Sequence, residues 1–290
     1  MRMNDKVIIG FLSPGEVDTM FALRLAAIFR ERRDRVVDLM TDENSGLLSR
    51  GRNQVVANFL AHSTGAEWLL MLDVDQQLML EDFDKLVAAA HDTDRPIVAG
   101  LYFGAWPGEF YPTAVPLIFY EHPQLPGRFV PFNEYPRDQI IPVDSAGTGC
   151  LLVHRSVFEK IAADADETHD IAHFADGSSA PAWCWFRDFP HRGDWFSEDH
   201  YFCARARERG FKLHAHTGVV LPHRKRFWLD ERHHLVQFPE KLTAEERRSP
   251  RWAPMSGPPP EMGEPETAEA APTVDERAVK PRPRRKVARR

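Results

Sequence analysis

Two carboxylates, Asp73 and Asp75, directly follow the apolar run Trp68–Leu72. A short apolar run bounded by polar residues is typical of a buried strand in a parallel sheet. Ligands of open α/β sheets bind outside the carboxyl ends of the strands, where this pair lies. If the extended geometry continues, both side chains point to the same side and repel each other unless a cation lies between them. Oxygen ligands favour Mg²⁺ or Mn²⁺, although a solvated loop after a core strand explains the pair equally well.

Two acidic residues also open a downstream helix. Glu198 and Asp199 follow Ser197, a natural N-cap, and acidic side chains in a first turn suit the helix dipole. Helix capping alone is a sufficient explanation of these acids when they are considered singly. Before them, Gly147-Thr148-Gly149 precedes an apolar strand, and its two glycines permit close approach of the backbone to a ligand.

A histidine near the end of the structured region is a further candidate metal ligand. His223 follows a short strand and opens the basic run His223–Arg226. A surface histidine in a basic loop is the simpler interpretation of this residue alone. His214 and His216 lie close by in sequence and are alternatives to it.

Strand and helix alternate through the first hundred residues, a pattern that predicts βαβ units and a Rossmann-like half. We expect strands over 6–12, 35–40, 68–72 and 96–102, and helices over about 20–29, 51–61 and 81–90. The apolar positions assigned to the buried face of the first helix are Met20, Leu23, Ala26, Ala27 and Phe29; those of the second are Val55, Val56, Phe59 and Leu60.

The second half of the chain has a different texture. Prolines are frequent from 104 to 142, where we expect long loops and short strands such as 114–120. Beyond the glycine loop we expect an apolar strand, a short helix capped by Ser156, an irregular surface insertion over 162–181, and strands over 211–216 and 217–221. Aromatic residues gather over 183–202. Three of them are candidates for a platform on which a ligand could stack, although such clusters more often form core: Trp183, Trp185 and Trp195.

Composition places the chain among globular proteins, with 290 residues, 43% of them hydrophobic and 28% charged. No run approaches the length of a membrane span, and the first residues lack the features of a signal peptide. Three widely spaced cysteines give no disulfide framework or zinc motif, so the expected compartment is a reducing cytoplasm.

Charge is distributed unevenly. The net charge is −6, but the last fourteen residues hold eight Lys or Arg and no acid. The remaining acidic body argues against a general nucleic-acid-binding surface. We expect one domain over 1–246, made of a first half at 1–103 and a second half at 104–246. We expect a disordered tail over 247–290, rich in proline and then basic.

These motifs, taken in order, resemble those of a known family. Together they are similar to the GT-A fold of nucleotide-sugar-dependent glycosyltransferases, especially glycosyltransferase family 2-like proteins, over roughly residues 5–230. The resemblance implies an α/β fold with a Rossmann-like, mostly parallel central sheet flanked by helices. It rests on Asp73-Val74-Asp75 as the DXD motif, Ala146–Gly149, the Glu-Asp helix segment Ser197–Ala206, His223 and the helix start Gly51-Arg52-Asn53.

The resemblance implies roles for the chemical groups. Asp75 would ligate the metal directly, Asp73 would contact the metal or the ribose, and His223 would complete the protein ligands. Histidine with carboxylate suits Mn²⁺ somewhat better than Mg²⁺. Asp199 would take the acceptor proton and Glu198 would position the acceptor, which favours inversion at the anomeric carbon. Retaining GT-A enzymes also carry acidic residues here.

The same resemblance implies a donor site for a UDP- or GDP-sugar, with a glycan, protein or small molecule as acceptor. The loop Ser13-Pro14-Gly15 would approach the base and ribose, and Arg52 would contact the base or a phosphate. Gly147, Thr148 and Gly149 would line the sugar side. Arg224, Lys225 and Arg226 would add positive charge near the diphosphate.

Other protein classes share parts of this pattern. Haloacid-dehalogenase-like phosphatases also place Asp-x-Asp after an apolar strand, but they usually carry Thr or Val where this chain has Gln77. Nucleotidyltransferases need a glycine-rich, lysine-containing loop that is missing after Leu12. A non-catalytic GT-A domain that binds a nucleotide or glycan, with the basic tail docking an acidic partner, is the remaining alternative.

Overall fold

The structure is a computed structural model that describes residues 6–13, 15–42, 47–106, 113–125, 127–163, 168–173, 179–191 and 194–225. Every statement below concerns these residues. The predictions made for Pro14, for Arg226 and for the tail beyond it lie outside the described residues.

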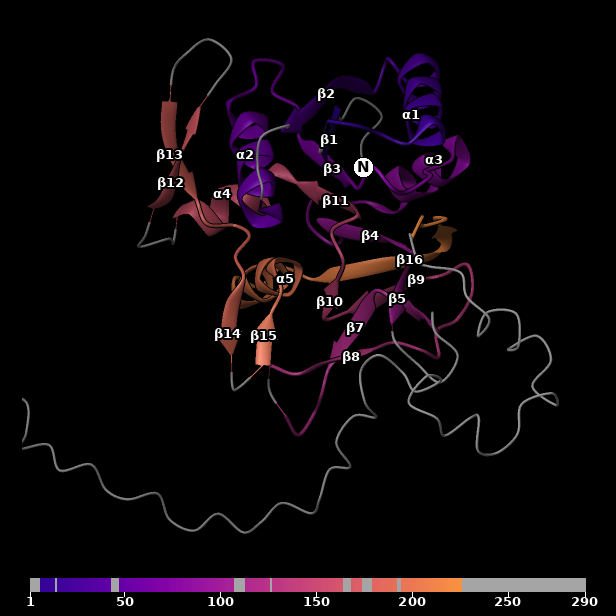
Figure 1. The fold of residues 1–290 in the computed structure, drawn as a ribbon, viewed down its shortest axis with the longest axis vertical. Helices are drawn as coiled ribbons and strands as arrows, with labels where there is room; N and C mark the ends of the chain where they lie inside the picture. The colour runs from indigo at the N-terminus through magenta and orange to yellow at the C-terminus, as the bar shows by residue number, and fades with distance from the viewer. Residues whose placement is uncertain are drawn as a thin grey trace, which may run out of the picture.

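A seven-stranded sheet forms the centre of the molecule (Figure 1). Its strand order is β2-β1-β3-β11-β4-β16-β9. The strands are β1 (Val7–Leu12), β2 (Val36–Asp42), β3 (Trp68–Leu72), β4 (Ile97–Leu101), β9 (Ile140–Val143), β11 (Cys150–His154) and β16 (Leu213–Val220). Strands β2, β1, β3, β4 and β16 run in the same direction, whereas β11 and β9 are antiparallel to their neighbours. The expected α/β fold with a mostly parallel central sheet is therefore confirmed.

Helices cover both faces of this sheet (Figure 1). One face carries α1 (Thr19–Glu31) and α3 (Leu80–Ala89), and the other carries α2 (Leu48–Ala61), α4 (Arg155–Ala163) and α5 (Glu198–Glu208). Two separate apolar cores lie between the helices and the sheet. The central strands β3 and β4 are buried along their whole length, as continuous apolar runs in a parallel sheet should be.

The buried face of α1 differs from the predicted one. Phe21, Leu25 and Ile28 are buried, whereas Met20 is 39% and Leu23 59% exposed. The buried residues are spaced at i, i+4 and i+7, and Phe21 packs edge-on against Phe11 with ring centroids 5.4 Å apart. The predicted positions formed a second apolar stripe, and the sequence pattern alone did not distinguish the two.

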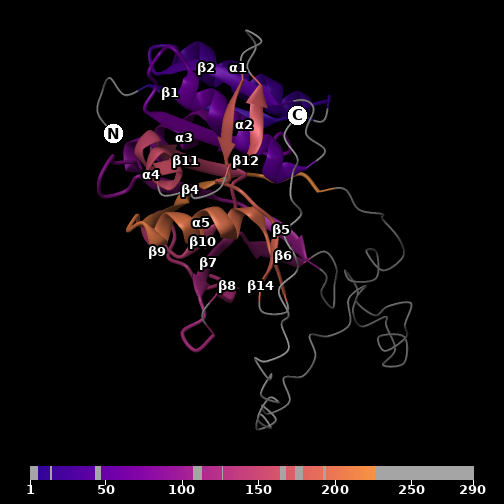
Figure 2. The same ribbon diagram turned by 90° about the vertical axis from the view of Figure 1, so that its left-hand side faces the viewer.

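The remaining strands form small ribbons at the margins. They are β5 (Phe103–Trp106) with β6 (Thr113–Pro116), β7 (Ile118–Glu121) with β8 (Phe129–Pro131) and β10 (Ser145–Ala146), β12 (Thr168–His173) with β13 (Ser179–Trp183), and β14 (Phe189–His191) with β15 (Asp194–Phe196). Figure 2 shows the small sheet of β7, β8 and β10 at the end of the molecule opposite α1 and β2.

Three further local predictions were wrong. The segment 162–181, expected to be irregular, contains the paired strands β12 and β13 beside α2. The two strands expected over 211–216 and 217–221 form the single strand β16, in which Thr217 and Gly218 remain extended. Helix α4 begins at Arg155, so Ser156 lies inside it, and its hydroxyl bonds to Nδ1 of His154 at 2.8 Å rather than capping the helix.

The strand directions bring the candidate motifs to one edge of the sheet. Because β11 runs antiparallel to β3, the glycine loop that enters β11 lies beside the end of β3, where Cys150 pairs with Leu72. Because β16 runs parallel to β4, the segment after β16 passes the end of β4. Strands from both predicted halves of the chain thus share one sheet.

Candidate functional site

Asp75 and His223 face each other at the carboxyl edge of the sheet. The chain turns after β3, and residues 74 and 75 lie in this turn. Gln76 forms an isolated backbone bridge with His223. This bridge places Nε2 of His223 3.1 Å from Oδ2 of Asp75. The sequence resemblance paired these two residues, and the structure brings them together across 148 positions of the chain.

The other ring nitrogen of His223 fixes the chemical character of this pair. Nδ1 lies 2.7 Å from the carbonyl oxygen of Phe103, which can only accept a hydrogen bond. Nδ1 therefore carries a hydrogen, so whenever the imidazole is neutral the lone pair of Nε2 faces the Asp75 carboxylate. Two acceptors that face each other need a positive charge between them: either a second proton on His223 or a metal ion bound by both residues.

Two basic residues stabilise the ionised form of Asp75. Lys225 Nζ lies 3.3 Å from Asp75 Oδ2, and the backbone N–H of Arg224 donates to the carbonyl oxygen of Asp75 at 2.8 Å. Burial raises the pKa of Asp75, but the hydrogen bond from His223 and the charge of Lys225 outweigh this effect, so the pKa is lowered overall. Asp75 is therefore ionised at neutral pH.

Arg224 also joins this edge to the loop after β1. Its Nη1 donates to Oδ2 of Asp18 at 2.5 Å, while Oδ1 of Asp18 caps the first turn of α1. In the same loop the N–H of Gly15 donates to the Ser13 hydroxyl at 3.3 Å. Ser13, Gly15 and the basic segment after β16 thus lie at the same edge of the sheet, while Pro14 lies outside the described residues.

Asp73 does not share the environment of Asp75. The strand ends at Leu72, so the alternation that would have placed both carboxylates on one side does not continue. Asp73 Oδ1 lies 3.4 Å from Nη2 of Arg52, away from the Asp75–His223 pair. Across the parts of the chain that the structure describes, no three His, Cys, Asp or Glu side chains lie close enough to hold one metal ion. The three expected ligands are therefore divided between two places.

Arg52 is the centre of an acidic cluster. Its Nη1 donates to Oε1 of Glu198 and, at 3.0 Å, to Oδ1 of Asp199, in addition to the Asp73 contact from Nη2. Arg52 is only 4% exposed. We expected this residue to contact the nucleotide base or a phosphate, but its guanidinium is engaged with three carboxylates of the protein. These neighbours raise its pKa despite burial, so it remains charged.

The two neighbouring carboxyl groups differ in protonation. Burial and the charge of Asp199 raise the pKa of Glu198, even though it makes the closer contact with Arg52. Burial opposes ionisation of Asp199, but Arg52 and a hydrogen bond from Glu198 lower its pKa overall. Glu198 therefore retains a proton under conditions where Asp199 is ionised, which agrees with different roles for the two acids.

The hydroxyl of Tyr102 lies so close to the loop of Gly147 and Gly149 that side chains at these positions would overlap it. A methyl group at Gly147 would lie 2.1 Å from the Tyr102 hydroxyl oxygen, and one at Gly149 would lie 2.3 Å from Nε2 of Gln76. The N–H of Gly149 donates to the Tyr102 hydroxyl at 2.9 Å. The close approach expected of these glycines is thus made to side chains of the protein itself.

Tyr102 also lies between the two chemical groups of the site. Its ring packs edge-on against His223 with centroids 5.2 Å apart, and its hydroxyl touches Gly147. A methyl group at Gly147 would come within 3.5 Å of Oδ2 of Asp199. This role of Tyr102 was not predicted from the sequence. Its position at the end of an expected strand, at the carboxyl edge where ligands bind, could have indicated it.

Two buried polar side chains near the glycine loop have no hydrogen-bond partner in the described part of the chain. They are Gln76, at both amide atoms, and Thr148, at its hydroxyl. Both residues are fully buried. Thr148 therefore lies beneath the surface of the loop, and Val74 packs against the core below the Asp pair.

The aromatic residues before α5 form core rather than an open platform where they are described. Trp185 is 1% exposed, and its indole N–H donates to the carbonyl oxygen of Phe158 at 2.9 Å. The side chains of Trp183 and Trp195 lie outside the described set. His200 stacks on Phe129 with centroids 4.7 Å apart and bonds to the Ser145 hydroxyl at 2.7 Å.

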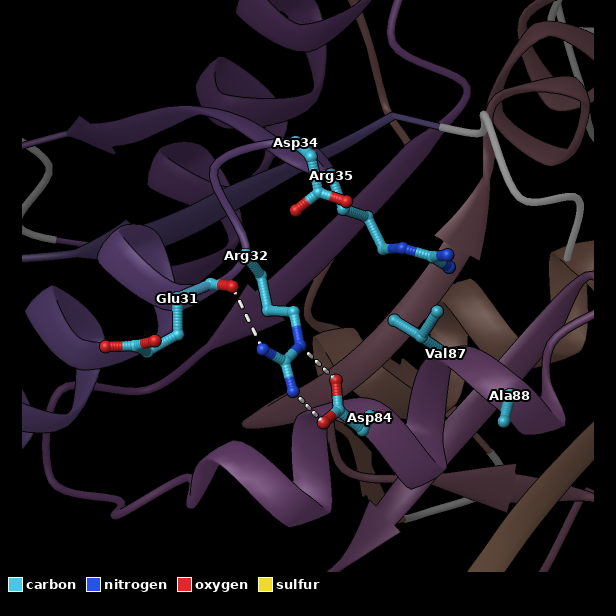
Figure 3. A pocket seen from close by; sticks show the side chains of 7 residues that line it. All are labelled: Glu31, Arg32, Asp34, Arg35, Asp84, Val87 and Ala88. Carbon is cyan, nitrogen blue, oxygen red and sulfur yellow. Dashed lines mark hydrogen bonds and ion pairs between the residues drawn. The ribbon is translucent and has the colours of Figure 1, made fainter.

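One pocket lies away from these motifs, between the C-terminus of α1 and α3 (Figure 3). Arg32 crosses it and donates from Nε and Nη2 to the two carboxylate oxygens of Asp84 at 2.7 and 2.5 Å. This ion pair ties α1 to α3. It is remote from the carboxyl edge and contains none of the residues singled out from the sequence.

No protein-family model and no curated protein sequence matches this chain. Among solved structures, A197 from STIV is similar at 16% identity over 76% of this chain and 86% of that one, with a TM-score of 0.44. No helix within the described residues is long and apolar enough to cross a membrane.

Two glycosyltransferases are also among the similar structures. GalNAc-T7 with UDP, GalNAc and Mn²⁺ is 9% identical over 78% of this chain and 45% of that one, with a TM-score of 0.43. The catalytic domain of Drosophila β1,4-galactosyltransferase 7 in complex with xylobiose is 14% identical over 82% of both chains, with a TM-score of 0.40. At these values the similarity does not carry an activity across, so the site itself must support the function.

Proposed function

We propose that this protein is a metal-dependent glycosyltransferase that moves a sugar from a nucleotide-diphosphate sugar to an acceptor hydroxyl, with inversion and with Asp199 as the base. One observation carries the proposal. Tyr102 is flanked on one side by a carboxylate–imidazole pair suited to a divalent cation and on the other by Asp199 at the start of a helix. The residues that would hold the metal ion and the residue that would act as the base are therefore separate but adjacent.

The residues at the carboxyl edge fit a divalent cation. Asp75 supplies a carboxylate and His223 a lone pair on Nε2, because Phe103 holds the hydrogen on Nδ1. Both residues would hold Mn²⁺ or Mg²⁺, whereas Asp73, which contacts Arg52 instead, would support the ribose. When bound, the metal ion stabilises the charge that gathers on a departing diphosphate.

The donor would lie along the same edge. We assign the nucleotide to the loop of Ser13 and Gly15 and to Asp73-Val74-Asp75. The sugar would lie against the backbone of Gly147 and Gly149, because the side chain of Thr148 is buried beneath the loop. The side chain of Lys225 lies beside Asp75 and that of Arg224 beside Asp18, and both carry the charge that a diphosphate needs. Lys225 would exchange its contact with Asp75 for one with the diphosphate.

Asp199 would act on the acceptor. The acceptor oxygen forms a bond to the anomeric carbon as the bond from that carbon to the phosphate oxygen breaks, and the hydroxyl proton passes to Asp199. Arg52 occupies Oδ1 of Asp199, while Oδ2 faces Gly147 and the sugar side. Glu198, which retains its proton, positions the acceptor.

The test is a panel of UDP-, GDP- and dTDP-sugars incubated with the protein and Mn²⁺, with nucleotide release as the measurement. We expect release from one nucleotide class, and we expect EDTA to abolish it. Failure of every donor to bind or hydrolyse in a metal-dependent way would overturn the proposal. Binding without transfer would identify a non-catalytic nucleotide-binding domain, and phosphate release from simple monoesters would identify a phosphatase.

Two variants separate the assigned roles. Asp75→Ala should abolish metal-dependent donor binding, because the remaining ligand His223 cannot hold the cation alone. Asp199→Asn should retain donor binding and lose transfer, because an amide cannot accept the acceptor proton. Full transfer activity in Asp199→Asn would show that another group is the base.

A further inference from the structure

Arg52 connects three separate segments of the chain. It lies in the first half of α2, and its partners are Asp73 after β3 and Glu198 and Asp199 in the first turn of α5. The guanidinium is almost completely removed from solvent, with 5% of its side chain exposed. A buried charge needs compensation, and here it is surrounded by carboxylates from two elements.

The charges in this cluster do not balance. One guanidinium faces three carboxyl groups, and Tyr102, which is close to Asp73 and Asp199, is neutral because burial raises its pKa. The neighbouring His200 is also neutral, since burial lowers its pKa. Without Arg52 the three acids would have no described positive group to offset their mutual repulsion, so they could not all stay ionised.

The contacts of Arg52 direct it to the acids of the protein. Both terminal nitrogens of the guanidinium donate to protein carboxyl groups, which engages three of its five N–H groups. These contacts link Arg52 to transfer through the acids, and through Asp199 in particular.

We propose that Arg52 is a positioning residue that holds Asp199 ionised and oriented at the start of α5. The part that concerns transfer rests on the proposed function. The electrostatic part does not, because it follows from a buried cluster that exists with or without substrate.

The first experiment needs no substrate. The urea midpoints of Arg52→Met, Asp199→Asn and the double variant are compared with the unchanged protein at pH 5 and pH 8. Arg52→Met should lose more stability at pH 8, where protonation of the acids is hardest, and Asp199→Asn should remove part of that loss. Equal losses at both pH values with strictly additive effects would overturn the proposal.

The second experiment uses nucleotide release with acceptor present. Removing the positive charge raises the pKa of Asp199, so Arg52→Met should move the acid limb of the kcat/KM profile to higher pH. At neutral pH the rate should fall about 100-fold, a typical loss when one preorganised electrostatic contact is removed. Arg52→Lys, which keeps the charge, should restore the acid limb even if the rate remains low.

A matched control comes from a second arginine that contacts α2. Arg155 donates to the carbonyl oxygens of Phe59, Leu60 and Ala66 and has no contact with the site. Arg155→Met should lower stability without shifting the pH profile. A shift as large as that of Arg52→Met would show that loss of structure alone explains both. If the protein turns over no donor at all, the proposed function is wrong. The urea midpoints of the Arg52 and Asp199 variants still test whether Arg52 stabilises the ionised acid.

Discussion

At the scale of single residues, the site depends on which partner each carboxylate has. Asp75 is paired with His223 and Lys225, whereas Asp73 is paired with Arg52. Two acids separated by one residue therefore serve different neighbours. The separation explains how one short motif can support both a cation site and the acidic cluster around the proposed base.

His223 should determine affinity for the cation. Alanine at this position removes the Nε2 lone pair that would bind the cation. We expect Mn²⁺ binding to weaken by at least about 10- to 100-fold, the loss typical of removing a residue that only orients a metal ligand. Isothermal titration of Mn²⁺ into the protein measures this. His216→Ala is the matched control, because Nδ1 of His216 only accepts the N–H of Gly218 at 3.1 Å. Unchanged Mn²⁺ affinity in His223→Ala would remove this histidine from the metal site.

The fit between Gly147 and Tyr102 gives a test of the loop. Gly147→Ala should destabilise the protein by about 1–3 kcal/mol, since the new methyl group overlaps the Tyr102 hydroxyl. Tyr102→Phe alone should cost about 1 kcal/mol or more, because the N–H of Gly149 loses its partner.

The double variant should lose less stability than the sum of the two single losses, because the hydroxyl that overlaps the new methyl group is gone. Urea unfolding of the four proteins measures this coupling. Additive losses would mean that the loop moves away from Tyr102 instead of packing on it.

At the scale of elements, α2 links the two halves of the chain. Arg52 reaches α5, and the neighbouring Asn53 pairs with the backbone of Phe186: its amide donates to the carbonyl oxygen and accepts the N–H, both at 2.9 Å. The sequence resemblance singled out the start of this helix, and the structure supplies a physical reason for both residues.

Asn53 should therefore contribute to stability more than its size suggests. Asn53→Ala leaves both backbone groups of Phe186 without this partner, and we expect a loss of about 1–3 kcal/mol in urea unfolding. Asn53→Asp keeps the shape and the acceptor but turns the donor into a second acceptor facing a carbonyl oxygen. Asn53→Asp should be at least as unstable as Asn53→Ala at pH 7. An aspartate variant as stable as the natural protein would show that the paired hydrogen bonds contribute little.

The sequence predicted elements best where burial leaves one possibility. The runs that became β1 and β3 are apolar throughout and bounded by polar residues, so their state followed from pattern alone. The face of α1 did not, because two apolar stripes compete and only packing against the core, including Phe11, decides between them. The ribbon β12–β13 was missed because its pairing depends on contacts with α2 rather than on a local apolar run.

The same distinction applies to the site. The resemblance paired Asp75 with His223, and the structure brings these two residues together. It did not reveal the partners of Arg52, because two of them, Glu198 and Asp199, lie more than a hundred positions away in the sequence.

At the scale of the whole molecule, the buried acids couple stability to pH. Burial and the charge of Asp199 raise the pKa of Glu198 above its ordinary value of 4.5. The folded chain then holds a proton that the unfolded chain releases as pH rises, so this residue makes folding less favourable with increasing pH. Asp199, whose pKa is lowered, acts in the opposite sense: its contribution is present above its ordinary value of 3.8 and is lost as pH falls through the lowered pKa.

Glu198→Gln should consequently change the pH dependence of stability. Glutamine mimics the protonated acid, so the variant should match the natural protein near pH 4.5 and become relatively more stable as pH rises. The gain is of the order of 1.4 kcal/mol for each unit by which folding raises the pKa. Urea unfolding from pH 4.5 to 8.5 measures it. Asp199→Asn is the comparison of opposite sign, less stable than the natural protein at neutral pH and similar to it in strong acid. If Glu198→Gln followed the natural protein at a constant offset across this range, Glu198 would be ionised in the folded chain, and the division of labour between the two acids would be wrong.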